Sequence, residues 1–137
     1  MKIAMYVTVL IAVLVIAVLG YVRLAPSDPD RWHVPVQATT SRDDAGGAIR
    51  VLSTDEVALA RVDAAARALA RTRVLAGSVA EGRITYITRS RVIGFPDYTT
   101  VEYSDGLLRM HARLRFGRSD LGVNAERLQR LLAAAEG

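Results

Sequence analysis

The first strong pattern along the chain is an apolar run from Ile3 to Val22 that contains no charged residue. A helix of this length spans about 30 Å at 1.5 Å per residue, the thickness of a bilayer core. A signal peptide has a shorter apolar region, typically about 7–15 residues, and a small-x-small cleavage site. Pro26 follows the nearest candidate site, and this disfavours cleavage. The run therefore predicts an uncleaved transmembrane anchor over residues 1–23.

The next segment, residues 24–50, has no sustained hydrophobic period. It carries Pro26, Pro29, Pro35 and the Gly46-Gly47 pair, residues that interrupt regular structure. We predict a proline-rich arm and linker here, with an extended first half and a turn or loop near Gly46.

A helical period begins after this segment. Ser53 and Glu56 fit a capping box, in which each side chain bonds a free backbone amide of the first turn. Apolar residues then recur at helical spacing at Leu59, Val62, Ala66 and Leu69. The pattern predicts a helix from Ser53 to about Ala70.

Four strand-like stretches follow. Residues 74–80 and 84–90 flank Glu81-Gly82, and residues 99–104 and 107–116 flank Asp105-Gly106. Asp-Gly favours a type I′ turn, which places Ser104 opposite Leu107. This register gives the second hairpin one apolar face and one polar face, and we expect the polar face to be solvated. The polar face carries Thr100, Glu102, Arg109, His111, Arg113 and Arg115, with a cross-strand pair between Glu102 and Arg109.

A last helical period follows Asn124, with an apolar stripe at Leu128, Leu131, Leu132 and Ala135. The predicted fold is α+β: an N-terminal transmembrane helix, then a small domain over residues 51–137. Its order is α-β-β-β-β-α, with an antiparallel sheet whose apolar face is covered by both helices.

Composition narrows the chemistry. The chain has no cysteine, so thiol catalysis and thiolate metal sites are excluded. Its net charge is +4, and every basic residue except Lys2 is arginine, which suits carboxylate and phosphate groups. Lys2 and the α-amine before the apolar run nearly balance the positive charge of Arg23 and Arg31 after it. The short tail and long following domain favour an N-in anchor with the domain exported.

The stretch RFGRSDLGVNAERL, residues 115–128, combines glycines, arginines and small polar residues before the last helix. In one interpretation, Gly117, Gly122 and the helix N-terminus cradle an anion that Arg118 and Arg127 neutralise. In the other, Ser119 and Asp120 form a turn, Gly122 takes a positive φ and Asn124 caps the helix. The stretch contains no P-loop motif.

The sequence gives little indication of a catalytic site or a metal site. A serine hydrolase at Ser119 needs a nearby histidine, but His33 lies in the arm and His111 lies in a strand among arginines. No set of carboxylates closes a metal site, and nothing indicates a cofactor. Nucleic acid is an unsuitable partner, because the basic face has few aromatic residues to stack on bases.

Three stretches resemble the domain of unknown function 1499 family, whose members are small and often membrane-anchored bacterial proteins. They are RLAPSDPDRWH after the anchor, RSRVIGFPDYTTV in the middle and GRSDLGVNAERL before the last helix. The last has the most specific pattern, G-R-S-D-x-G-x-N-x-x-R. The chain departs from the family at His111 to Phe116, where small residues are expected. The resemblance implies no mechanism, because the family has no established activity.

We therefore predict a non-enzymatic domain, anchored in the bacterial inner membrane and exposed to the periplasm. It would bind a membrane-protein partner or an anionic ligand such as lipid. The predicted binding residues are Arg89, Arg91, Asp97, Arg118, Ser119, Asp120, Asn124 and Arg127, with Asp97 also expected to pair with an arginine of the last motif. The alternative is an enzyme with its site at the 117–127 loop. A pocket there with a carboxylate and convergent arginines would favour the enzyme, and a flat basic face toward the membrane would favour the binder.

Overall fold

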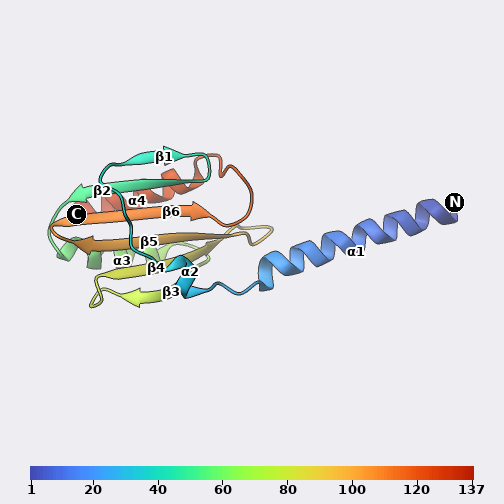
Figure 1. The fold of residues 1–137 in the computed structure, drawn as a ribbon, viewed down its shortest axis with the longest axis horizontal. Coiled ribbons are helices and arrows are strands. Elements are labelled where there is room, and N and C mark those ends of the chain that lie inside the picture. Colours follow the sequence, from blue (N-terminus) through green and yellow to red (C-terminus); the bar gives the residue numbers. More distant parts are fainter.

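The computed structural model describes all residues from 1 to 137 and shows a long helix leading into one α+β domain (Figure 1). The elements in chain order are α1 (Lys2–Leu24), α2 (Pro29–Trp32), β1 (Arg42–Asp44), β2 (Gly47–Ser53), α3 (Val57–Ala68), β3 (Thr72–Ser78), β4 (Arg83–Arg89), β5 (Pro96–Ser104), β6 (Leu107–Leu114) and α4 (Val123–Glu136). By length and composition, α1 is the one helix suited to cross a membrane.

The domain is built on one antiparallel sheet with the strand order β1-β2-β6-β5-β4-β3. The predicted α+β class is confirmed, but the sheet has six strands instead of the four predicted. The two additional strands, β1 and β2, lie largely in the segment predicted as arm and linker. Gly47 makes the pairing of β2 with β6 possible, because a Cβ there would lie 2.4 Å from the carbonyl oxygen of Ala112.

The second hairpin has the predicted register. Ser104 lies opposite Leu107 and Thr100 opposite His111, and the turn residues Asp105 and Gly106 both have positive φ. The type I′ turn requires this geometry, and Asp-Gly supplies it at low cost. The turn sequence therefore fixed which side chains of β5 and β6 share a face.

Helices α3 and α4 cover one face of the sheet, as predicted, and form the main core with it (Figure 1). Leu59 and Val62 of α3 and Leu128 and Leu131 of α4 are almost completely buried. Burial of each such side chain contributes about 1.5–3 kcal/mol. This layer is the principal source of stability and fixes where α4 begins.

The opposite face is covered by residues 26–38, which we call the strap, so its predicted solvation is wrong. The Trp32 ring stacks on Tyr98 with centroids 3.9 Å apart, and His33 Nδ1 lies 2.9 Å from Thr85 Oγ1. Arg113 donates to the carbonyl of Trp32 at 2.6 Å. The alternation of apolar and polar residues in β5 and β6 correctly separated the two faces of the sheet. It could not show that the preceding strap folds back over the polar face.

Two local contacts also differ from the predictions. Glu102 lies opposite Arg109 in the register, but its ion pair is with Arg83, at 2.5 Å. Arg109 instead donates to the carbonyl of Ala38 at 3.0 Å. Helix α3 begins at Val57, later than Ser53, because β2 extends through Ser53 and Asp55 accepts from the amide of Ala58 at 3.1 Å.

The last turn of α1 is bound directly to the domain. Arg23 donates to the carbonyls of Ile93 at 2.9 Å and Val92 at 2.6 Å, both in the β4–β5 loop. Arg89, at the end of β4, donates to the carbonyl of Val22 at 3.4 Å. Val22 is buried, unlike the rest of α1. The helix therefore leaves the domain from a fixed position at one end of the sheet (Figure 1).

The strap face makes stability pH-dependent through His111. Burial, followed by the charge of Arg113, lowers the pKa of His111 to about 4 from an ordinary value of 6.5. The unfolded chain thus takes up a proton at this site before the folded protein does, so stability present above pH 6.5 is lost as the pH falls toward 4.

We expect His111→Gln to lose less stability than the wild type as the pH falls, by up to about 2 kcal/mol in the free energy of unfolding. This value allows for the partial exposure of the side chain. Denaturant unfolding of both proteins between pH 7 and pH 4.5 measures the difference, and comparison with the variant cancels titrations that the two proteins share. Parallel pH profiles would show that His111 does not contribute.

Candidate functional site

An open groove lies at the end of the domain from which α1 emerges, which we call the α1 end. It has a volume of about 370 Å³ and lies between the N-terminus of α4, the ends of β4 and β5, and the turn before β3. Six of the eight predicted binding residues line it: Arg89, Arg91, Asp97, Ser119, Asp120 and Arg127. The fold thus brings together residues from two loops that are far apart in sequence.

The inner wall of the groove is a bonded network centred on Asp97. Asp97 Oδ2 accepts from Asn124 Nδ2 at 3.2 Å and pairs with Arg127 Nη1 at 3.5 Å, as the predicted Asp97–arginine contact requires. Asn124 Nδ2 also donates to Asp120 Oδ2 at 2.7 Å, and Arg127 donates to Asn124 Oδ1. Two carboxylates and one guanidinium are therefore linked through a single buried amide.

Burial dominates the electrostatics of this network. It raises the pKa of Asp97 above its ordinary value, although Arg127 and Asn124 act to lower it. Burial also lowers the pKa of Arg127, against the opposing effect of Asp97. In both residues the desolvation cost exceeds the attraction of the partner, so the pair is held in place by the surrounding fold.

The N-terminus of α4 is capped, but not by the residue that the sequence predicted. Gly122 has a positive φ of 81°, as predicted, but the capping carboxylate belongs to Asp120. It accepts from the amides of Gly122 at 2.9 Å and Asn124 at 3.3 Å. Asn124 lies inside the first turn with its fully buried side chain turned toward Asp97. The sequence pattern identified the right residues but assigned the cap to the wrong one.

Two of the predicted binding residues, Arg118 and Ser119, have no part in this network. Ser119 lines the groove and its Oγ accepts from the amide of Leu121 at 3.3 Å, which is a turn contact. Arg118 is exposed and does not line the groove.

A second hollow, continuous with the groove, is lined almost entirely by arginine. Arg23, Arg71, Arg89 and Arg91, which we call the arginine cluster, surround about 370 Å³ together with Ser90 and Gly94. No carboxylate lies within 4.0 Å of any of the four guanidinium groups. Arg71 donates from Nε to the carbonyl of Arg89 at 3.0 Å, which leaves its terminal nitrogens without a partner.

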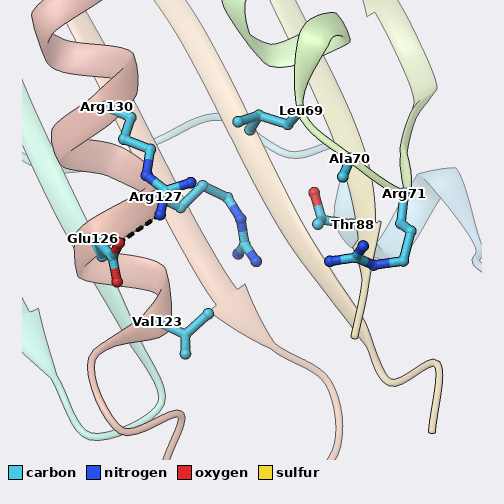
Figure 2. Close-up of a pocket in the computed structure, with 8 residues that line it drawn as sticks. All are labelled: Leu69, Ala70, Arg71, Thr88, Val123, Glu126, Arg127 and Arg130. Carbon is cyan, nitrogen blue, oxygen red and sulfur yellow. Dashed lines mark hydrogen bonds and ion pairs between the residues drawn. The ribbon is translucent and has the colours of Figure 1, made fainter. Parts of the chain in front are cut away.

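Figure 2 shows a smaller hollow on the other side of Arg71, about 220 Å³ in volume. Arg127 from α4 and Arg71 from the turn after α3 point toward one another across it, and Thr88 also lines the hollow. Arg130 is turned away and pairs with Glu126. Arg71, Thr88 and Arg127 are shared with the groove, so the three hollows form one continuous basic depression.

Both histidines lie on the strap face of the sheet, whereas the groove opens at the end of the helix face. His33 bonds Thr85, and burial lowers its pKa. A Ser119–histidine pair is therefore not formed. No cluster of three or more Asp, Glu or His side chains that could hold a metal ion occurs in the chain.

These features define a class: a two-layer α+β domain on an N-terminal apolar helix, with a basic depression beside the helix junction. A family model described as a protein of unknown function, DUF1499, matches residues 22–134. The chain belongs to this family, and the resemblance seen in the sequence is confirmed. A comparison with curated proteins found no match.

Proposed function

We propose that this protein is a non-enzymatic membrane-anchored domain that binds a phosphate-bearing anionic ligand in its arginine cluster, with bilayer phospholipid as the source. The observation that carries the proposal is the convergence of four arginines without a carboxylate partner. Bringing like charges together is unfavourable unless an anion completes the site. Arginine also presents a planar fork that matches phosphate oxygens.

The retention of α1 as an anchor is part of this proposal. A signal sequence is removed after export, but Val22 and Ala25 are buried against the domain and Arg23 binds the β4–β5 loop. Cleavage would remove contacts that the fold uses. The proposal includes an N-in orientation of α1 in the bacterial inner membrane, with the domain in the periplasm.

The position of the arginine cluster supports lipid as the ligand source. Arg23 belongs to the last turn of α1, so the cluster begins where an α1 that spans the bilayer would meet the headgroup layer. Anionic headgroups there attract basic residues with about 1 kcal/mol per charge near the surface.

An enzyme with its site at the 117–127 loop is the second candidate. One observation favours it: the groove holds a carboxylate, Asp97, whose pKa is raised by burial, as in many general bases. Against it, Asp97 is already engaged by Asn124 and Arg127, and neither histidine reaches the groove. A pocket with a carboxylate and convergent arginines was expected to favour an enzyme, and the groove has both. Its carboxylates are already bonded within the fold, Asp97 to Asn124 and Arg127 and Asp120 to Asn124.

We expect the double variant Arg71→Gln/Arg91→Gln to lose at least about tenfold in retention of phosphatidylglycerol. Each lost charge-assisted contact to phosphate is worth about 1.5–3 kcal/mol, and 1.4 kcal/mol is tenfold. The full chain is reconstituted in nanodiscs of equal phosphatidylcholine and phosphatidylglycerol and extracted in mild detergent. Mass spectrometry then counts the bound lipid.

The control is Arg31→Gln/Arg42→Gln, which makes the same charge change at two exposed arginines outside the cluster. Equal lipid retention by both double variants would contradict the proposal. A stoichiometric membrane protein that copurifies with the full chain from native membranes, without enriched lipid, would also contradict the proposal and identify a protein partner.

A further inference from the structure

A set of large apolar side chains is exposed at the α1 end, and all of them except Phe95, which also lines the groove, lie outside the hollows described above. Leu24 is 84% exposed, Val92 78% and Leu121 93%. Val92 lies in the β4–β5 loop, where Phe95 is also exposed, and Leu121 lies in the β6–α4 loop. We call Leu24, Val92, Phe95 and Leu121 the apolar rim. Both loops lie at the end of the sheet from which α1 departs (Figure 1).

Leu121, the most exposed member of the apolar rim, contributes little to the stability of the fold. Leu121 has a φ of 55°, a left-handed conformation that residues with a β-carbon rarely adopt, and its side chain contacts almost nothing in the domain. Glycine or asparagine would suit that backbone better. Exposed apolar side chains gathered at one end of a domain are typical of a surface that binds a partner or a membrane.

The two rim loops are fixed around the last turn of α1. Tyr21 of α1 packs edge-on against Phe116 with ring centroids 6.0 Å apart, and Phe116 lies 6.3 Å from Phe95. Arg23 donates to the consecutive carbonyls of Val92 and Ile93 in the β4–β5 loop. The rim is thus continuous with the fully exposed apolar surface of α1.

We propose that the apolar rim inserts into the interfacial layer of the same bilayer that α1 crosses, so that the domain docks on the membrane as well as being tethered to it. This inference rests on the proposed retention of α1 as an anchor but not on any ligand in the arginine cluster. Continuity with α1 selects the bilayer as the occupant. The neighbouring arginines complement the rim, because apolar tips flanked by basic side chains suit an interface of acyl chains and anionic headgroups.

The absence of cysteine permits a direct test. Single-cysteine variants Val92→Cys and Leu121→Cys of the full chain are labelled with an environment-sensitive fluorophore and reconstituted in nanodiscs. Lipids with a spin label at a shallow acyl position are the quencher. The matched control is Ala80→Cys, at an exposed position in the turn between β3 and β4 at the opposite end of the domain. Val13→Cys, in the middle of α1, reports whether the helix is in the bilayer.

We expect the labels at positions 92 and 121 to be quenched at least about threefold more strongly than the label at position 80. Quenching at position 13 alone would overturn the inference and leave the proposed anchoring intact. A label at position 13 that is neither quenched nor protected from water would overturn both. Rim labels that are shielded from water but not quenched by lipid would show a protein partner or a second copy instead, and would also overturn the inference. The substituted side chains are exposed, so folding is not at risk.

Discussion

Replacement of Asp97 with alanine is expected to lower the free energy of unfolding by about 3 kcal/mol or more, because it leaves the charge of Arg127 buried without its partner. The Arg127 side chain is only 12% exposed, and its pKa is already lowered by burial. Asn124 would also lose the acceptor for one of its two amide contacts. Denaturant unfolding of the full chain in detergent, followed by circular dichroism, measures the effect.

The double variant Asp97→Ala/Arg127→Met separates the ion pair from the packing. An apolar residue of similar volume removes the uncompensated charge, so much of the lost stability should return. If the double variant is destabilised as much as the sum of the single variants, the two side chains act independently and the network described here is not the cause.

The second large effect is expected from Trp32→Ala, with a loss of about 2–3 kcal/mol, somewhat below that of a fully buried tryptophan. The substitution removes the stack on Tyr98, whose rings are nearly parallel at 11°, and a cation–π contact with Arg113 at 5.6 Å. The backbone carbonyl that Arg113 binds remains. Because Trp32 lies in the strap, we expect the strap to open before the sheet unfolds.

Limited proteolysis of residues 26–41, combined with denaturant unfolding, checks this result. Trp32→Phe is the matched control, since a smaller ring still stacks on Tyr98. Equal cleavage of the alanine and phenylalanine variants would show that the remaining polar contacts of the strap, such as His33 with Thr85, hold it in place on their own.

Local signals predicted most of the domain correctly. The Asp105-Gly106 turn predicted the register of β5 and β6, and the apolar stripes predicted α3 and α4 on one face. Strand β2 was missed because its alternation is short and follows a Gly-Gly pair that reads as a loop. The pairing that makes it a strand comes from β6, whose paired residues lie 54 to 66 positions later in the chain.

The candidate site was also predicted only where its signal is local in the sequence. Residues 89–97 and 118–127 were identified because each loop concentrates charged and small polar residues locally. Arg71 and Arg23 were missed because each stands alone in its own segment, and only the fold brings them to the others. The covered polar face was missed for a related reason: no pattern within β5 and β6 encodes that Trp32 will stack on Tyr98.

The attachment of Arg23 and Arg89 to opposite sides of the same junction has a mechanical consequence. A domain joined to its anchor by a slack tether tumbles freely and searches a wide volume above the bilayer. Here there is no flexible linker between anchor and domain, because the last turn of α1 is itself hydrogen-bonded to the domain. Under the proposed anchoring, the domain would turn and drift only as the anchor does, and it would present one fixed side to whatever diffuses past in the plane of the membrane. The domain would then encounter mainly molecules embedded in, or bound to, the same membrane.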